Sequence, residues 1–123
     1  MNQATTWRRK IEEYEADLYR NQTVKFLGFS FQSRARSGEI EVKKYDNGEN
    51  RLEIKFFGVE VPDGSAVSVV LDEKPVCDVD VRQGLGRVQL HVQGEAVAAV
   101  RNGSAAEIRY MGQVLLQGTF RPD

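Results

Sequence analysis

Histidine, cysteine and tryptophan each occur only once in the 123 residues, as His91, Cys77 and Trp7. A single cysteine excludes an intrachain disulfide and a zinc site built on several thiolates. A single histidine excludes a metal site with several histidine ligands. Alternation in the predicted strand around His91 turns this side chain toward solvent, and we expect Cys77 to be a small, buried core residue.

The sequence also lacks a long apolar run and an excess of charge of either sign. No segment approaches the roughly 18 apolar residues that a membrane-spanning helix needs. The first residues are polar and charged, so we expect a cytoplasmic protein without membrane contact, although a signal peptide removed earlier would leave no trace. With 17 basic and 18 acidic residues, the net charge of −1 gives no general attraction for nucleic acid or anionic lipid.

Alternating apolar and polar residues are abundant from position 23 onward, and turn residues separate the alternating segments. This pattern predicts short antiparallel strands. They are expected at residues 24–31, 39–44, 51–57, 67–71, 77–81, 87–92, 106–110 and 114–120, with a polar loop at 32–37 and a helical turn or bulged loop at 94–100. Seven or eight such strands indicate an antiparallel β sandwich or a partly open barrel.

The predicted strands form two similar units. The segment VEVPDGSA at residues 59–66 returns as AAVRNGSA at residues 98–105, an offset of 39, and Gly64 corresponds to Gly103. The offset is 36 between the strands 51–56 and 87–92, which places a three-residue deletion in the intervening hairpin. We therefore predict an internal duplication, with repeats at approximately 38–75 and 77–120, inside one β domain at 23–123.

The same series of motifs resembles a known group of proteins. From Gly38 to Phe120 the chain runs through an alternating pair, a turn, R-[apolar]-x-[apolar], V-P-D-G-x-x-V-x-V and a closing V-L-x-G-T-F. This series resembles all-β repeat modules of uncharacterised bacterial proteins. The resemblance implies a duplicated β fold, and it implies no activity and no catalytic residues.

Residues 1–22 show a different spacing. Four apolar residues recur at intervals of four, three and four, which would place them on one face of a helix. They are Trp7, Ile11, Tyr14 and Leu18. A helix of this length needs support, so we predict that the stripe either packs on the β domain or binds a protein partner or a second copy of the chain.

No constellation of nucleophile, base and ligand stands out, so we expect a non-catalytic protein-interaction or structural module that needs no cofactor and no metal. The alternative is a β domain that binds a small ligand or single-stranded nucleic acid. Its basic candidates are Arg34, Arg36, Lys43 and Lys44. Four acidic residues near one predicted hairpin leave a calcium-like site open, although no D-x-D-x-D-G loop is present. They are Asp72, Glu73, Asp78 and Asp80.

Overall fold

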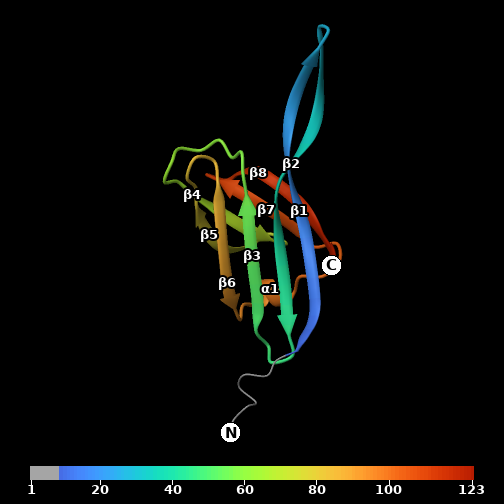
Figure 1. Ribbon diagram of the computed structural model, residues 1–123, viewed down its shortest axis with the longest axis vertical. Helices are drawn as coiled ribbons and strands as arrows, with labels where there is room; N and C mark the ends of the chain where they lie inside the picture. The colour runs from blue at the N-terminus through green and yellow to red at the C-terminus, as the bar shows by residue number, and fades with distance from the viewer. Residues whose placement is uncertain (1–8) are drawn as a thin grey trace.

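The computed structural model describes residues 9–123, which form eight antiparallel strands and one short helix. The strands make a single sheet in the order β5-β4-β7-β8-β1-β2-β3-β6, curled into a nearly closed barrel (Figure 1). Their bounds are β1 Lys10–Phe26, β2 Phe29–Tyr45, β3 Asn50–Phe56, β4 Ala66–Leu71, β5 Lys74–Asp80, β6 Gly86–Val92, β7 Ala105–Tyr110 and β8 Gln113–Pro122. The mainly β fold and the barrel-like arrangement are thus as predicted.

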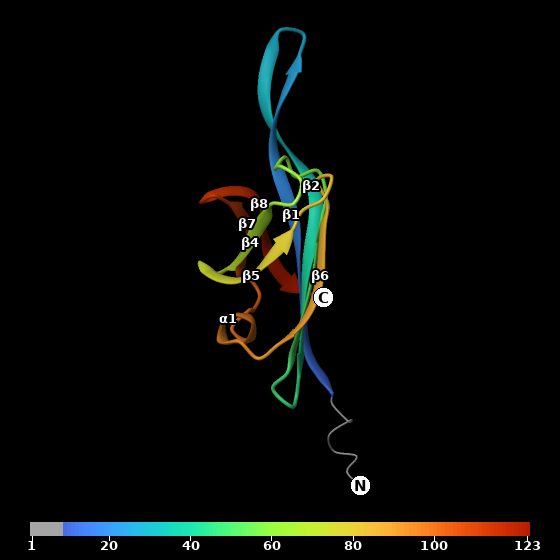
Figure 2. The ribbon, with the colours of Figure 1, turned by 90° about the vertical axis from the view of Figure 1, so that its left-hand side faces the viewer.

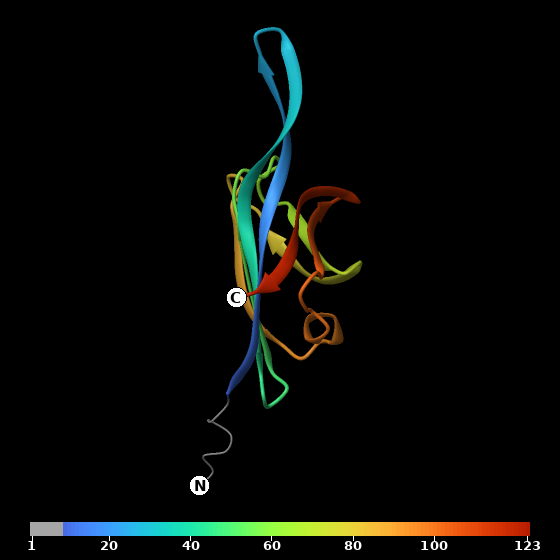
Figure 3. The same ribbon diagram turned by 90° about the vertical axis from the view of Figure 1, so that its right-hand side faces the viewer.

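The barrel is flattened into two layers. In the side views, β1, β2, β3 and β6 form one layer, and β4, β5, β7 and β8 form the other (Figures 2 and 3). The helix α1 (Glu95–Ala98) covers one end of the space between the layers and buries Val97 there. This helix lies in the segment 94–100, for which the sequence predicted either a helical turn or a bulged loop. In the described part of the chain, no helix has the length and apolarity to cross a membrane.

The core forms because alternate residues of each strand face the barrel interior. In the pairing of β2 with β3, Ile40 lies opposite Ile54 and Val42 lies opposite Leu52, and all four side chains are buried. The residues between them point outward, and on this outer surface they are mostly charged. Cys77 is half-buried against the core, and burial raises the pKa of its thiol.

The predicted N-terminal helix is wrong in the region that the structure describes, because Lys10–Phe26 forms strand β1. Ala16 and Leu18 are buried, and Tyr14 packs against the core. These three residues lie at intervals of two, which is the period of a strand. Pairing with β2 on one side and β8 on the other supplies the backbone hydrogen bonds that a helix would have made internally.

The segment 24–31 was predicted to be one continuous strand, and this is also wrong. The chain reverses at Leu27 and Gly28, both of which have positive φ, as the two central residues of a type I′ hairpin turn require. Residues 32–37, predicted to be a loop, belong to β2. β1 and β2 are therefore strands of 17 residues each, joined by a two-residue turn.

Candidate functional site: a projecting hairpin

The β1–β2 hairpin extends well beyond the barrel. β8 pairs with β1 only as far as Tyr19, and β3 pairs with β2 only from Gly38 onward. Between residues 20 and 37, β1 and β2 therefore pair with no third strand, and they form a two-stranded ribbon that projects from one end of the molecule (Figure 1). We call residues 20–37 the arm. Its root is at the barrel, and its tip is the turn.

One face of the arm is apolar in the half that is nearer the tip. The register places Val24 opposite Phe31 and Phe26 opposite Phe29. Directly opposed residues share a face of a ribbon, so these four side chains lie together. The exposed fractions are 64% for Phe26, 73% for Phe29 and 51% for Phe31. Within residues 9–123, no element covers this face.

The opposite face of the arm is polar. Thr23 lies opposite Gln32, and Lys25 lies opposite Ser30. The Gln32 side-chain amide donates a hydrogen bond of 3.0 Å to the Thr23 hydroxyl. The tip half of the arm is thus amphipathic in cross-section, with a hydrogen-bonded polar face and an open apolar face.

The turn at the tip adds a further apolar side chain. Leu27 has φ 51° and is 80% exposed. A left-handed conformation costs a non-glycine residue roughly 1 kcal/mol, and asparagine or aspartate is preferred at this place in such turns. Leu27 gains no burial within the described residues in exchange for this cost.

The arm also differs from the barrel in charge. It contains four basic residues and no acidic residue; removing its four positive charges from the chain's net charge of −1 leaves −5 for the rest of the chain. Three of these cations lie in the root half and have partners there. Arg20 donates to the Gly58 carbonyl at 3.0 Å, Arg34 lies 4.3 Å from the centre of the Tyr19 ring, and Arg36 pairs with Asp17 at 3.1 Å.

A groove of about 610 Å³ opens beside the root of the arm, near the two unpaired ends of the sheet. Phe57 and Leu85 stand on its rim and are 48% and 54% exposed. Its wall includes Phe56, and Arg36 and Gly38 connect it to the arm. The groove is therefore a second exposed surface with apolar side chains, and it lies at the root of the arm, away from the phenylalanines near the tip.

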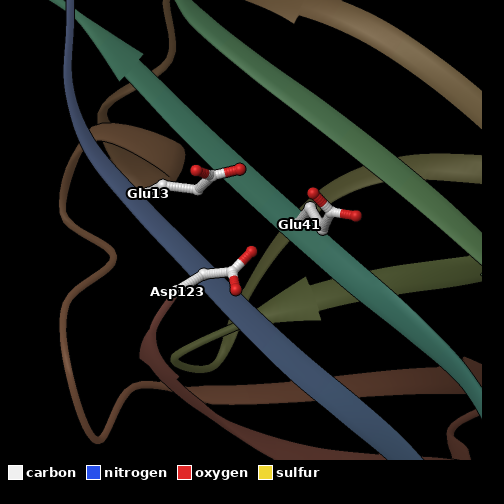
Figure 4. Close-up of side chains that lie close together, drawn as sticks. All are labelled: Glu13, Glu41 and Asp123. Carbon is white, nitrogen blue, oxygen red and sulfur yellow. The ribbon is translucent and has the colours of Figure 1, made fainter.

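The outer face of β1, β2 and β3 carries a dense array of charges. Figure 4 shows Glu13, Glu41 and Asp123, whose carboxylate oxygens come within 4.8 Å of one another. Lys10 pairs with Glu13 at 2.7 Å, and Lys43 lies 3.7 Å from Glu13 and 3.9 Å from Glu41. The hydrogen bond from Lys10 lowers the pKa of Glu13, whereas burial raises the pKa of Glu41.

A second acidic cluster contains Glu15, Asp17 and Glu39. A hydrogen bond to Glu39, together with burial, raises the pKa of Glu15 to about 7. The same hydrogen bond, with one from Lys55, lowers the pKa of Glu39. Because lysine and arginine side chains pair with both clusters, these carboxylates form ion-pair networks, and they carry no independent sign of a metal site.

The structure disperses the four residues predicted as a partner-binding stripe. Trp7 lies outside the described residues. Leu18 is buried in the barrel, Tyr14 is half-buried against the core, and Ile11 is exposed near the start of β1. The described members of the stripe thus do not share one exposed face.

The four basic residues of the nucleic-acid alternative are likewise separated. Arg34 and Arg36 lie on the arm, whereas Lys43 is surrounded by carboxylates on the outer face of the barrel. Lys44 donates to the backbone carbonyls of Ala98 and Val100 at the end of α1. The arrangement does not bring these four side chains into one continuous surface.

Two of the remaining acidic candidates have other partners. Asp72 accepts a hydrogen bond from the Ala105 amide at 2.8 Å, and Glu73 pairs with Arg109 at 3.2 Å. His91 is exposed on β6, as alternation predicts. The residues that sequence reasoning missed are the phenylalanines of the arm, and the unusual density of large apolar residues around Leu27-Gly28 was the available signal.

Comparisons with known proteins add nothing to this picture: no family model, no curated protein and no solved structure matches the chain.

Proposed function

We propose that this chain is a non-catalytic protein-interaction module in which the barrel is a rigid base and the arm is the contact element. The observation that carries the proposal is the open face of Val24, Phe26, Phe29 and Phe31 on a ribbon that leaves the barrel. Contiguous exposed apolar surface of this kind commonly marks a binding site.

Energetics support the same proposal. Burying a phenylalanine side chain is worth roughly 1.5–3 kcal/mol relative to leaving it in water, and three of them share this face. A two-stranded ribbon is only marginally stable by itself, and packing against a third element is the usual remedy. A partner that covers the apolar face would therefore stabilise the arm and gain affinity from the same contacts.

The nucleic-acid alternative has less support from the distribution of charge. Of its candidate cations, Arg36 and Lys43 already face carboxylates, and the Lys44 ammonium is bound by carbonyl groups. Counterion release needs cations that are available to phosphates. A small ligand could use the groove beside Phe57 and Leu85. However, the groove is lined by no buried polar atom that lacks a hydrogen-bond partner and could orient such a ligand.

We also infer that the base arose by internal duplication. The Gly64 amide donates to the Val81 carbonyl at 2.8 Å, and the Gly103 amide donates to the Phe120 carbonyl at 2.8 Å. Both glycines have positive φ, 86° and 95°. The turns that the sequence pairs at an offset of 39 thus make equivalent contacts, each with the strand that follows the next hairpin.

The register between the two units supports the same inference. Leu52 pairs with Leu90, and Ile54 pairs with Val88. At the sequence offset of 36, Leu52 corresponds to Val88 and Ile54 to Leu90, so each residue pairs with the counterpart of the other. Such reciprocal pairing is expected of two units related by a local two-fold axis.

The functional proposal is tested by photo-crosslinking in the cells that make the protein. A photoreactive phenylalanine analogue at position 29 should give a discrete protein adduct. The same analogue at His91, which is exposed on the barrel, should give none. Equal labelling from both positions, or no protein adduct from position 29, would show that the arm is not the contact element.

A further inference from the structure

We propose that the arm binds an extended acidic segment of a partner protein, which adds to the sheet as a strand along the outer edge of β2, the edge that faces away from β1. This inference rests on the proposed function, since it takes the arm as the contact element and names the chemistry of its partner. The argument uses the unpaired edge of β2, the charges along it and the groove at its foot.

The outer edge of β2 is open along the arm. β3 pairs with β2 from Gly38 onward, and just beyond it the Phe57 amide donates a hydrogen bond of 2.8 Å to the Ser37 carbonyl. Within the described residues, the stretch 29–36 pairs with β1 alone. Every second residue of such an edge directs its N–H and C=O groups away from the sheet. An open row of this kind is a template for a further strand, which here would continue the line of β3.

This edge also lacks devices that block strand addition elsewhere in the sheet. The edge strand β5 begins with Lys74 and Pro75, and its pairing with β4 contains a bulge. In contrast, residues 29–36 include no proline and no glycine, and their pairing with β1 is regular. A strand of this length is typical of β-sheets, so the edge can accept a partner strand along its whole length.

The side chains along this edge indicate the sequence of the added strand. Alternation places Phe29 and Phe31 on the apolar face, and it places Arg34 and Arg36 on the opposite face. Arg34 lies against the neutral Tyr19 ring, so no carboxylate contact balances its charge within the described residues. An antiparallel partner, the arrangement of every strand pair in the described sheet, would place acidic residues opposite the arginines and apolar residues opposite the phenylalanines. Its sequence would read acidic-x-acidic-x-x-apolar-x-apolar.

The groove extends the positive charge at the foot of this edge. It is lined by four cations and two carboxylates. Glu39 already pairs with Lys55 at 2.8 Å and with Arg36 at 3.3 Å. Arg82 and Arg87 are exposed, without a carboxylate partner in the described part of the chain, and Arg87 lies directly opposite Lys55, which has the same charge. A strand that continues the line of β3 therefore begins beside cations that an acidic residue can neutralise.

The same observations argue against two other occupants. Insertion into a lipid bilayer would cover the phenylalanines, but the open edges of a ribbon carry backbone groups that hydrocarbon cannot satisfy. A second copy of β2 would bring its own Arg34 and Arg36 to an edge that is already positively charged. An acidic strand satisfies the backbone groups and the charge together.

The first experiment selects binding sequences from a phage-displayed library of random peptides on the full chain. Enriched peptides should contain acidic-x-acidic-x-x-apolar-x-apolar, because this order matches the edge of β2. Enrichment of sequences without this order, or no enrichment at all, would overturn the inference.

The second experiment measures the affinity of one enriched peptide by fluorescence anisotropy. Arg34→Glu should raise the dissociation constant about tenfold, because it replaces an attraction at the edge by a repulsion. Lys25→Glu makes the same change of charge on β1, away from the bound edge, and should change the constant by less than about twofold. A peptide with lysine in place of its acidic residues should bind the Arg34→Glu variant more tightly than it binds the wild-type chain. Equal effects of the two substitutions would overturn the assignment to the edge of β2.

Hydrogen exchange with the same peptide tests the backbone contact. Binding should slow the exchange of the amides that point outward from β2 in residues 29–36, because they become hydrogen-bonded to the added strand. The amides that point outward from β1 in residues 20–26 should exchange as in the free chain. Protection confined to the edge of β1 would overturn the inference.

The outcomes separate the inference from the proposed function. A protein adduct from position 29 without an enriched acidic motif overturns strand addition and leaves the interaction module intact. A chain that gives no protein adduct and floats with vesicles of phosphatidylcholine and phosphatidylserine overturns both.

Discussion

β1 and β2 pass through two environments, and the same alternating pattern has a different result in each. Inside the barrel their inward residues, such as Leu18 and Ile40, are completely buried by other strands of the chain. Near the tip of the arm, Phe26 and Phe29 are at least as apolar, yet both remain mostly exposed. Alternation therefore specifies which face is apolar, and the neighbouring strands decide whether this face becomes a core or a binding surface.

Charge shows the same contrast. The barrel face of these strands carries carboxylates that lie close together and are balanced by lysine and arginine, as in the contacts of Glu13 with Lys10 and of Glu39 with Lys55. The arm has no carboxylates at all. The arm therefore has an excess of positive charge and the rest of the chain an excess of negative charge, and the ion pair of Arg36 with Asp17 joins the two at the root of the arm. Four predictions follow this contrast from the largest expected effect to the smallest.

Replacing one apolar residue in each region should give the largest difference. Ile54→Ala, in the barrel core, should lower the free energy of unfolding by about 2–5 kcal/mol, because it removes buried methyl groups and leaves a cavity. Phe29→Ala should change it by less than ~0.5 kcal/mol. Both variants are compared with the wild-type chain by urea unfolding. Equal losses would mean that the arm is part of the folding core.

Gly38 in β2 and Gly28 in the turn at the tip should also respond differently to substitution. A Cβ at Gly38 would lie 2.3 Å from the Lys55 carbonyl oxygen and 2.7 Å from the Phe56 Cα, so Gly38→Ala should cost about 1–3 kcal/mol. At Gly28 no atom lies within 4 Å of the added Cβ, and φ is 82°. Gly28→Asn should cost less than ~0.5 kcal/mol, because asparagine tolerates positive φ. Thermal unfolding of the two variants measures the difference.

Glu15 should make the stability of the barrel depend on pH. Its pKa, raised to about 7 by the hydrogen bond to Glu39 and by burial, lies above the usual value of 4.5. The native state then holds the proton more tightly than the unfolded chain does, so stability should fall as pH rises from about 4.5 to about 7. Glu15→Gln should remove this loss, worth about 1 kcal/mol at pH 8 after allowance for solvent screening.

A matched substitution at Glu13 should change the stability of the barrel in the opposite direction. The pKa of Glu13 is lowered by its hydrogen bond with Lys10, so Glu13→Gln should destabilise the barrel at pH 8. Melting temperatures of both variants at pH 5 and pH 8 provide the test. If Glu15→Gln destabilises the protein at pH 8, the shared hydrogen bond does not raise the pKa of Glu15 as described.

The smallest effect concerns the turn at the tip. Leu27→Asn places the preferred residue at a position of positive φ in a type I′ turn, so the arm itself should become more stable by about 0.5 kcal/mol. Hydrogen exchange of the amides in residues 20–37 measures this change.

The sequence alone indicated most of the barrel because its strands are short and strictly alternating. Six of the eight predicted strands, from Arg51 to Phe120, coincide closely with β3 to β8, and a seventh, at 39–44, covers the part of β2 that lies in the barrel. The turns at Gly64 and Gly103 lie where the repeat places them. These features depend on neighbouring residues and on glycines at positive φ. Local chemistry of this kind is visible in the sequence.

The N-terminal part was predicted incorrectly because two periods coincide there. Tyr14 and Leu18 are four residues apart, which fits one face of a helix and also one face of a strand. The better signal was the alternation of Glu13, Glu15 and Asp17 with the core-facing residues. Only the pairing with β2 decides between the two structures. Most of these contacts join residues that are more than 20 positions apart in the chain.

Tertiary structure alone determined the candidate site. The sequence identified the apolar character of residues 24–31, but a continuous strand and a hairpin place Val24 and Phe31 quite differently. Once the chain reverses at Leu27 and Gly28, the two residues lie opposite each other on one face. Whether that face is covered depends on where β3 and β8 end. These endpoints are set by non-local pairing in the barrel, which composition and local spacing do not encode.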